Sequence, residues 1–361
     1  MRITSIKEEQ TIVNLLNIFI LTLLQHKTVI AEDVNFPIIT LENKILELKL
    51  TPETGGRISH FSLKGQRNFL NIGDVFKKNV LPVVSPFADN IGYLGHMVWV
   101  GPQSQWWLQQ KLNEDRLANK ANWPPDPFTV LATNTIKKQS KKQVLLHGVK
   151  SPITGLRLDK AVSLSRENTN QVNLKATATN ISAQNKAWNL WFNTRVHGNT
   201  YIITTVSSRK DVKIISFANE NVSPITINYI NYKPNNFFVE LDVRNFIRTN
   251  KSNQGKVLIH PNQGWLAGFN QGQLFIIAFP LQDKSKIHPE HGQIEVYTNY
   301  HPKNIENSLI EMEFHGSFQT LKPKEKMSVD ATWYLFPYPV GWDKKRKLNF
   351  LQKQLLALGL F

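Results

Sequence analysis

The sequence predicts an all-β sandwich built mainly of antiparallel strands. Short segments in which apolar and polar residues alternate recur along the whole chain, and they show no regular alternation with helical segments. Aromatic residues, Asn and Thr are plentiful, whereas Ala-rich or Leu-rich helical runs are few. No repeat or linker interrupts the pattern, so we expect a single domain over residues 32–361.

The N-terminal segment, residues 1–31, has the features of an export signal. Arg2 and Lys7 precede an apolar stretch from Ile12 to Leu24, and residues 29–31 (VIA) suit a cleavage site. A transmembrane helix needs about 20 apolar residues, so we expect no transmembrane segment in the mature chain. An uncleaved anchor or a buried helix is the alternative. We therefore expect the mature protein to be periplasmic or secreted.

The chain is strongly basic, with 43 Lys and Arg, 27 Asp and Glu, and a formal net charge of +16. Apart from Lys137–Lys142 and Lys344–Lys347 the basic residues are scattered, and no nucleic-acid-binding motif is present, so we expect no nucleic acid partner. The absence of cysteine excludes disulfides, Cys-ligated zinc and thiol nucleophiles.

The first strands follow the predicted signal. Leu41 to Leu50 shows period-two alternation, a turn at Gly55-Gly56 follows, Arg57 to Leu63 resumes a strand, and Gly65 to Asn68 closes a hairpin. Lys137 to Leu146 reads as a basic turn followed by the start of a strand.

Further strands are expected over most of the remaining chain. The clearest of these signals cover residues 155–164, 172–178, 188–196, 274–279, 295–299, 309–314 and 329–335. Residues 207–262 predict more short strands, with loops at 231–236 and 250–255. The tail from Lys344 predicts a short amphipathic helix that packs on the sandwich or contacts a membrane.

The stretch from Gly95 to Pro127 contains four of the nine tryptophans, and its four prolines disfavour long regular structure. We expect a loop whose aromatic rings stack on a sugar while its polar groups bind hydroxyls. The alternative is that the tryptophans plug one end of the sandwich. The candidate ligands in this stretch are His96, Trp99, Gln103, Trp106, Trp107 and Trp123.

Two carboxylates occur on one face of the strand from Leu309 to Phe314. Glu311 and Glu313 are two residues apart, which places them about 7 Å apart on the same side. Strand interiors usually avoid acids, so the pair indicates a polar cleft, with a solvated strand face as the alternative. Three residues nearby could join them, namely His315, Tyr297 and Asn299.

Several of these segments resemble galactose-mutarotase-like (aldose 1-epimerase-like) domains. TPETGGRISHFSLKGQRNFL resembles their opening; GHMVWVGPQSQWW with WPPDP, SPITGLRLDKAVSL, TATNIS, EVYTN and LIEMEFHGSFQTLKPKEKMSVDATWYL then follow in the order seen in an uncharacterised branch. The likeness covers about residues 40 to 335. It implies a β-supersandwich of large twisted antiparallel sheets, with a carbohydrate site on the concave face.

The resemblance also implies roles for individual residues. Glu311 corresponds to the general base that acts on the anomeric hydroxyl, and Glu313 replaces a glutamine of the family. The position of the general acid, usually histidine, holds Trp191, which argues against robust epimerase activity. His96 is then the candidate polar group, and His197 could substitute only if its loop folds back.

Two further site predictions concern charged groups. Arg57, directly after Gly55-Gly56, is a candidate ligand of a hydroxyl or a carboxylate. Carboxylates and imidazoles of the predicted site could hold Ca²⁺ or another cation, but no dedicated metal-ligand spacing is present. We therefore expect neither a metal nor another cofactor.

The leading hypothesis is an exported carbohydrate-binding protein with a mutarotase-like site. One alternative is an enzyme, either an aldose 1-epimerase-like isomerase or a polysaccharide lyase or hydrolase with Glu311 as base. The other is a structural envelope protein whose basic surface contacts anionic glycan or lipid.

Overall fold

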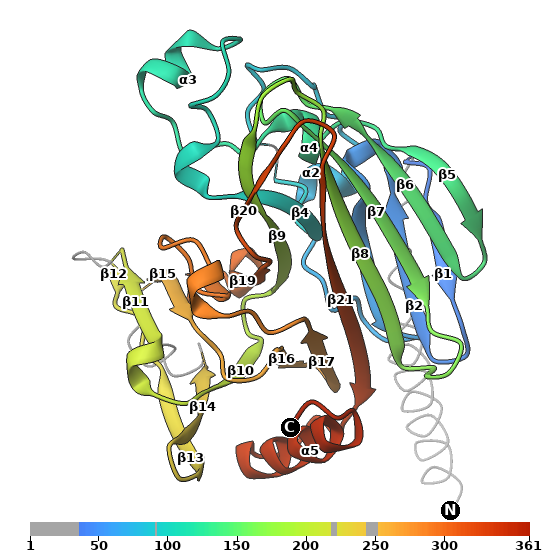
Figure 1. Cartoon of the computed structure of the whole chain (residues 1–361). Coiled ribbons are helices and arrows are strands. Elements are labelled where there is room, and N and C mark those ends of the chain that lie inside the picture. The colour runs from blue at the N-terminus through green and yellow to red at the C-terminus, as the bar shows by residue number, and fades with distance from the viewer. Residues whose placement is uncertain (1–35, 91, 218–221, 243–251) are drawn as a thin grey trace, which may run out of the picture. The chain divides into compact units, whose positions relative to one another are not determined.

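Two large β-sheets pack face to face in the computed structural model, which confirms the predicted all-β sandwich (Figure 1). The structure describes residues 36–90, 92–217, 222–242 and 252–361. The predicted export signal, residues 1–31, lies outside the described residues. Among the described strand pairs only β12 and β15 run parallel; the others are antiparallel.

The first sheet has 11 strands. In spatial order its main path is β1 (Ile39–Glu42), β2 (Leu46–Thr51), β3 (Arg57–Leu63), β4 (His96–Gly101), β9 (Lys186–His197), β19 (Leu309–His315), β18 (Ile294–Tyr300), β15 (Ser252–Ile259) and β11 (Val212–Ser216). Two short strands are attached to this path, β12 (Val222–Ser223) beside β15 and β20 (Gln319–Leu321) beside β9.

The second sheet has 10 strands. Their spatial order is β13 (Asn228–Lys233), β14 (Asn236–Leu241), β10 (Tyr201–Val206), β16 (Trp265–Asn270), β17 (Gln273–Ala278), β21 (Lys326–Pro337), β8 (Gln171–Asn180), β7 (Leu156–Leu164), β6 (Gln143–Lys150) and β5 (Thr135–Ser140). The described helices are α2 (Asp74–Lys77), α3 (Glu114–Ala118), α4 (Pro127–Val130) and α5 (Lys344–Ala357).

The core lies between the facing sides of the sheets. The ring of Phe61 on the 11-stranded sheet lies 5.4 Å from that of Phe275 and 5.2 Å from that of Trp333 on the other sheet. All three side chains are almost wholly buried. Burying large aromatic side chains supplies most of the driving force for packing two sheets together.

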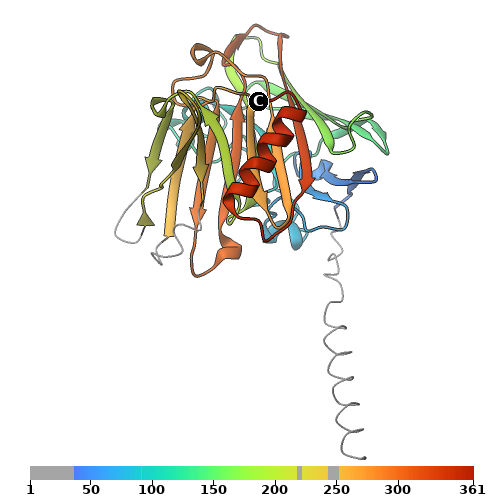
Figure 2. The same cartoon turned by 90° about the horizontal axis from the view of Figure 1, so that it is seen from below.

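Helix α5 confirms the amphipathic tail predicted from Lys344. Figure 2 shows it lying across the strands of the 10-stranded sheet. Its buried residues Leu351 and Leu355 pack with Tyr201, Trp265 and other residues of that sheet. The helix therefore covers apolar surface of one half of the sheet, at β10, β14, β16 and β17. Within the described part of the chain, no helix combines the length and hydrophobicity needed to span a bilayer.

Three sequence predictions about loops are wrong, and a fourth is confirmed only in part. The Trp-rich stretch contains strand β4, because His96–Gly101 pairs with β9. The basic run at Lys137 to Lys142 is mostly the exposed edge strand β5, and lysine is a usual residue on such edges. The described part of the predicted loop at 250–255 belongs to β15. The predicted loop at 231–236 is confirmed only at residues 234–235, which form the tight turn between β13 and β14.

Candidate functional site

Strand β19 directs its two glutamates away from the core. Phe314 faces inward, where its ring stacks on Phe279 at 4.5 Å. Since side chains alternate along a strand, Glu311, Glu313 and His315 lie on the opposite side. We call this side of β9, β19, β18 and β15, which faces away from the 10-stranded sheet, the polar face.

The polar face carries a paired glutamate and arginine at its partly exposed part. Arg195 on β9 is opposite Glu311, and its Nε donates to Oε1 at 2.7 Å. The guanidinium of Arg195 also lies 4.5 Å from the centre of the Trp99 ring. On the other flank of Glu311 is Tyr297, whose hydroxyl accepts a hydrogen bond from Gln254 at 2.9 Å. Glu311 keeps 12% of its side chain exposed, so it remains reachable from solvent.

A second carboxylate, Glu295, lies at the centre of a buried network. His291 Nδ1 donates to its Oε1 at 2.6 Å, His315 Nε2 lies 3.4 Å from the same oxygen, and Lys256 Nζ lies 3.2 Å from Oε2. Burial alone would raise the pKa of Glu295, but its three cationic or hydrogen-bonding neighbours outweigh burial and hold that pKa well below the usual value. Burial lowers the pKa of His315 to about 3, so its ring is neutral.

The environment of Glu313 shifts its pKa in the direction opposite to that of Glu295. Its Oε1 accepts a hydrogen bond from the Asn193 amide, and its side chain is wholly buried. Burial, followed by the negative charge of Glu311, raises the pKa of Glu313 well above the usual value. The face therefore holds two carboxyl groups, Glu313 and the Glu295 opposite it on β18, whose pKa values are shifted in opposite directions.

A wall of four tryptophans borders the carboxylates. The ring of Trp191 on β9 lies 5.0 Å from Trp99 and 5.9 Å from Trp106, and Lys256 Nζ lies 4.9 Å from its centre. Trp99 also contacts Trp123 at 6.2 Å. Of the four, only Trp123 is well exposed, at 48%. The aromatic stretch and the acidic strand thus meet on the polar face, and Trp123 is the ring that solvent can reach.

The network around Glu295 also has the donor set of a metal site. Ligand atoms of His291, Glu295 and His315 all lie within 4.8 Å of one another, and two imidazoles with one carboxylate are ligands that Zn²⁺ accepts. However, Lys256 already balances the charge of Glu295. The cluster is therefore electrostatically complete with its own side chains, and we assign no metal to it.

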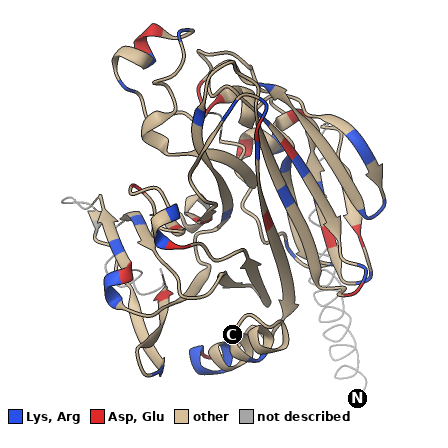
Figure 3. Cartoon of the chain, in the orientation of Figure 1, with Lys and Arg blue, Asp and Glu red and all other residues tan. Residues whose placement is uncertain are grey.

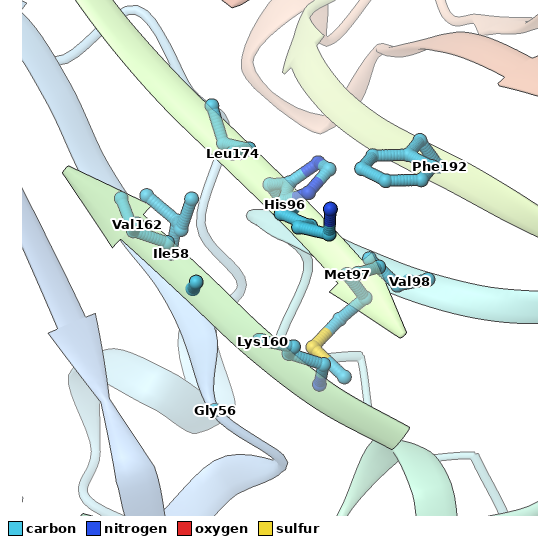
Figure 4. A pocket seen from close by; sticks show the side chains of 12 residues that line it. Gly56, Ile58, His96, Met97, Val98, Lys160, Val162, Leu174 and Phe192 are labelled. Carbon is cyan, nitrogen blue, oxygen red and sulfur yellow. The ribbon is translucent and has the colours of Figure 1, made fainter. Parts of the chain in front are cut away.

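His96 is not part of the polar face. His96 is opposite Thr194 on β9, whereas Glu311 is opposite the next residue, Arg195. Since neighbouring residues of a strand point to opposite sides, His96 lies on the other side of the sheet from Glu311. Its Nδ1 is hydrogen-bonded to Thr194 Oγ1 at 2.9 Å, and its ring packs on Trp333 at 4.8 Å. Figure 4 shows His96 and Lys160 beside a cavity of about 20 Å³ between the sheets, which has room for one water molecule. The predicted meeting of His96 with Glu311 is therefore wrong.

Two predicted sugar ligands in the Trp-rich stretch stabilise that stretch itself. Trp107 is wholly buried, its Nε1 donates to the Pro124 carbonyl at 2.8 Å, and the guanidinium of Arg116 lies 4.4 Å from its ring. The Gln103 amide donates to the Asn122 carbonyl at 2.8 Å. The expectation that Trp107 stacks on a sugar is wrong because no face of the ring is free. The same holds for Trp99 and Trp106, which are at least 96% buried.

Of the remaining predicted site residues, some lie on the polar face and one lies elsewhere. Arg57 is buried, and its two terminal nitrogens donate to the carbonyls of Leu94 and Val130, so it holds two loops together. His197 Nε2 donates to the Asn68 carbonyl at 3.1 Å. The strand registers place the following predicted residues on the polar face: Glu311, Glu313, His315, Tyr297, Asn299 and His197.

Sequence reasoning did not assign several residues of this face. Arg195, Glu295 and Lys256 are charged residues inside strands, a signal that could have marked them as members of a polar cluster. Trp191 could be identified only as the replacement of an expected histidine. His291 lies in a connecting segment, and no pattern pointed to it.

The comparisons with known proteins match this architecture. A family model described as a domain of unknown function (DUF4380) matches residues 37–336. A putative aldose 1-epimerase from Escherichia coli K12 is similar in structure, with a TM-score of 0.50 and 14% identity over 84% of this chain and 99% of that one. A galactose mutarotase-like protein from Lactobacillus casei ATCC 334 has a TM-score of 0.52 and 10% identity over 83% and 100% of the two chains. At these identities the likeness shows the fold alone. No curated protein sequence matches the chain.

Proposed function

The chain belongs to the family described as a domain of unknown function (DUF4380), and we propose that it is a carbohydrate-binding protein whose ligand lies on the polar face. The observation that carries the proposal is that the exposed ring of Trp123 contacts Trp99, the ring against which Arg195 lies while it donates to the carboxylate of Glu311. Aromatic surface beside a charged hydrogen-bonding pair is the chemistry that a sugar ring requires.

The reachable groups define where the ligand would sit. Trp123 offers an exposed ring face, while Glu311, Tyr297 and Asn299 are partly exposed and offer hydrogen-bonding groups. The C–H face of a sugar would rest on Trp123, and its hydroxyls would meet the carboxylate, phenol and amide. The names of the two similar structures, an aldose 1-epimerase and a galactose mutarotase-like protein, support the same ligand class. We further propose that the residues after the predicted signal act as one exported domain.

The binding proposal is tested by calorimetric titration of the purified protein with a panel of monosaccharides and oligosaccharides. We expect saturable binding of at least one sugar, with the affinity strongly reduced in Glu311→Gln. Glu325→Gln is the matched control, because Glu325 is an exposed glutamate on the turn before β21, away from the polar face. Equal affinity of the Glu311→Gln variant and the wild type would contradict the proposal.

A second candidate function, isomerisation of an aldose, is favoured by the opposite pKa shifts of two neighbouring acids. The pKa of Glu313 is raised and that of Glu295 is lowered, and such a split is the arrangement that acid–base catalysis uses. Exchange between sugar anomers, followed by NMR, separates the two functions. A rate above the uncatalysed background that disappears in Glu311→Gln supports the enzyme, whereas saturable binding with background exchange supports binding alone.

A further inference from the structure

The 10-stranded sheet carries a basic groove on its outer side, at the half that α5 leaves uncovered, and we propose that this groove binds an acidic polysaccharide. It is formed by β5 to β8 and lies on a different sheet from the polar face. The proposal is therefore independent of the sugar site, and a test of one does not decide the other.

Small residues on the central strand form the floor of the groove. Ala161 and Ser163 of β7 lie on the outer side, since Val162 between them is buried. Their neighbours across the strands are longer: Ser163 is opposite Gln143 on β6 and Asn173 on β8. Short side chains between rows of longer ones leave a hollow along the sheet.

The hollow is large enough for several sugar residues. Two adjoining depressions have volumes of about 730 and 250 Å³, and both are lined by Gln143, Ser163 and Asn173. Ligand sites in proteins usually fall between about 300 and 1,000 Å³. Amide and hydroxyl groups along the shared floor can donate to and accept from sugar hydroxyls.

Positive charge surrounds this floor. Figure 3 shows Lys and Arg along β5, at the edge of the sheet. The residues that line the two depressions include five basic ones, Lys138, Lys141, Lys142, Arg166 and Lys175. Only two lining residues are acidic, and one of them, Asp330, already lies 3.7 Å from Lys175. The groove therefore has a net positive charge and attracts a polyanion.

The lining favours an acidic polysaccharide over other anionic partners. None of the residues that line the two depressions is aromatic, whereas sites for single-stranded nucleic acid stack bases on aromatic rings. Leu145 is the lining residue with an exposed large apolar side chain, at 38%, which is too little apolar surface for insertion into a lipid interface. Carboxylates or sulfates on a hydroxyl-rich chain match both the charge and the polar floor.

The test measures binding of polygalacturonate to the full-length protein by calorimetry, with neutral dextran and a single-stranded DNA oligonucleotide as comparison ligands. The groove variant combines Lys138→Gln, Lys142→Gln and Arg166→Gln. The control variant removes the same charge from exposed positions elsewhere, with Lys78→Gln, Lys111→Gln and Lys322→Gln.

We expect the wild type to bind polygalacturonate, with affinity that falls as salt is raised from about 50 to about 200 mM. The groove variant is expected to bind at least about tenfold more weakly, and the control variant to bind like the wild type. Equal losses in both triple variants, or no loss in the groove variant, would overturn the assignment. DNA that binds as tightly as polygalacturonate would also overturn it.

A second substitution tests the shape of the groove without changing its charge. Ser163→Gln places a long side chain on the floor, and we expect it to weaken polygalacturonate binding several-fold at constant salt. Ser328→Gln is the control, because Ser328 is an exposed serine on β21 outside the depressions. Unchanged binding of the Ser163→Gln variant would show that charge acts without the groove and would contradict the proposal.

Discussion

Arg195 donates its Nε–H to Oε1 of Glu311 at 2.7 Å. The two residues lie on neighbouring strands and are 116 positions apart in the sequence. The side chains of the pair are 6% and 12% exposed. The pair joins the aromatic wall to the acidic strand.

The ion pair predicts different effects on stability and on binding. Glu311→Gln leaves Arg195 as a buried cation without its carboxylate, and we expect the free energy of unfolding to fall by about 3 kcal/mol. Replacing both residues, with Arg195→Met and Glu311→Met, removes the unpaired charge and should recover part of that loss. Sugar affinity should stay low in both proteins. Urea unfolding combined with calorimetric titration measures the two effects.

Two tryptophans of the same stretch should behave in opposite ways. Trp123 is 48% exposed, so Trp123→Ala is expected to weaken sugar binding by about 1–2 kcal/mol while unfolding changes little. Trp107 is wholly buried, so Trp107→Ala should lower the free energy of unfolding by about 3–5 kcal/mol. Sugar titrations and urea unfolding of both variants check this. Full sugar affinity of the Trp123→Ala variant would contradict the proposal that the sugar stacks on Trp123.

The buried Glu313 predicts a pH-dependent stability difference. Its pKa is raised by burial and by Glu311, so between the usual value of 4.5 and the higher folded-state value the folded chain keeps a proton that the unfolded chain releases. Its contribution therefore lowers stability as pH rises through this window. Glu313→Gln mimics the protonated form and should be more stable than the wild type by at least about 1 kcal/mol at pH 8.

This difference should shrink towards zero near pH 4, where Glu313 is protonated in both states. Thermal unfolding from pH 4 to pH 8 measures it, and Glu167→Gln serves as the control for losing an exposed glutamate. A wild-type protein that is more stable than Glu313→Gln at pH 8 would mean that Glu313 is ionised and paired.

His96 should matter for folding and not for the ligand. It lies between the sheets, with Nδ1 bonded to Thr194, and burial lowers its pKa well below the usual value. His96→Ala is expected to lower the free energy of unfolding by about 2–4 kcal/mol. At a temperature where this variant is folded, sugar affinity and anomer exchange should equal those of the wild type. A loss of sugar affinity or of anomer exchange in folded His96→Ala protein would show that His96 belongs to the functional site.

The sequence allowed much of the fold to be predicted because alternation reports burial directly. Strand β7 was predicted to within one residue, since its buried and less buried positions alternate. Strand β3 was predicted with its bounds because glycine turns precede and follow it. Strand β4 was missed because all six of its residues are buried, so that no alternation marks it. The edge strand β5 was missed for the converse reason, since all of its residues are exposed.

The candidate site was only partly predictable, because side-chain spacing gives the face of a strand but not its neighbours. The spacing of Glu311 and Glu313 correctly indicated that they share a side. Their partners Arg195 and Glu295 depend on which strands pair, and this is decided by the packing of the whole sandwich. His96 shows the same limit, since the side on which it lies was fixed only when β4 paired with β9.

The central claim is that a carbohydrate binds on the polar face beside the Arg195–Glu311 pair. A crystal structure of the protein soaked with a sugar that binds in titration tests it most directly. We predict a sugar ring against Trp123 with a hydroxyl within hydrogen-bonding distance of the Glu311 carboxylate. A sugar bound at any other place, with the polar face free of ligand, would contradict the account.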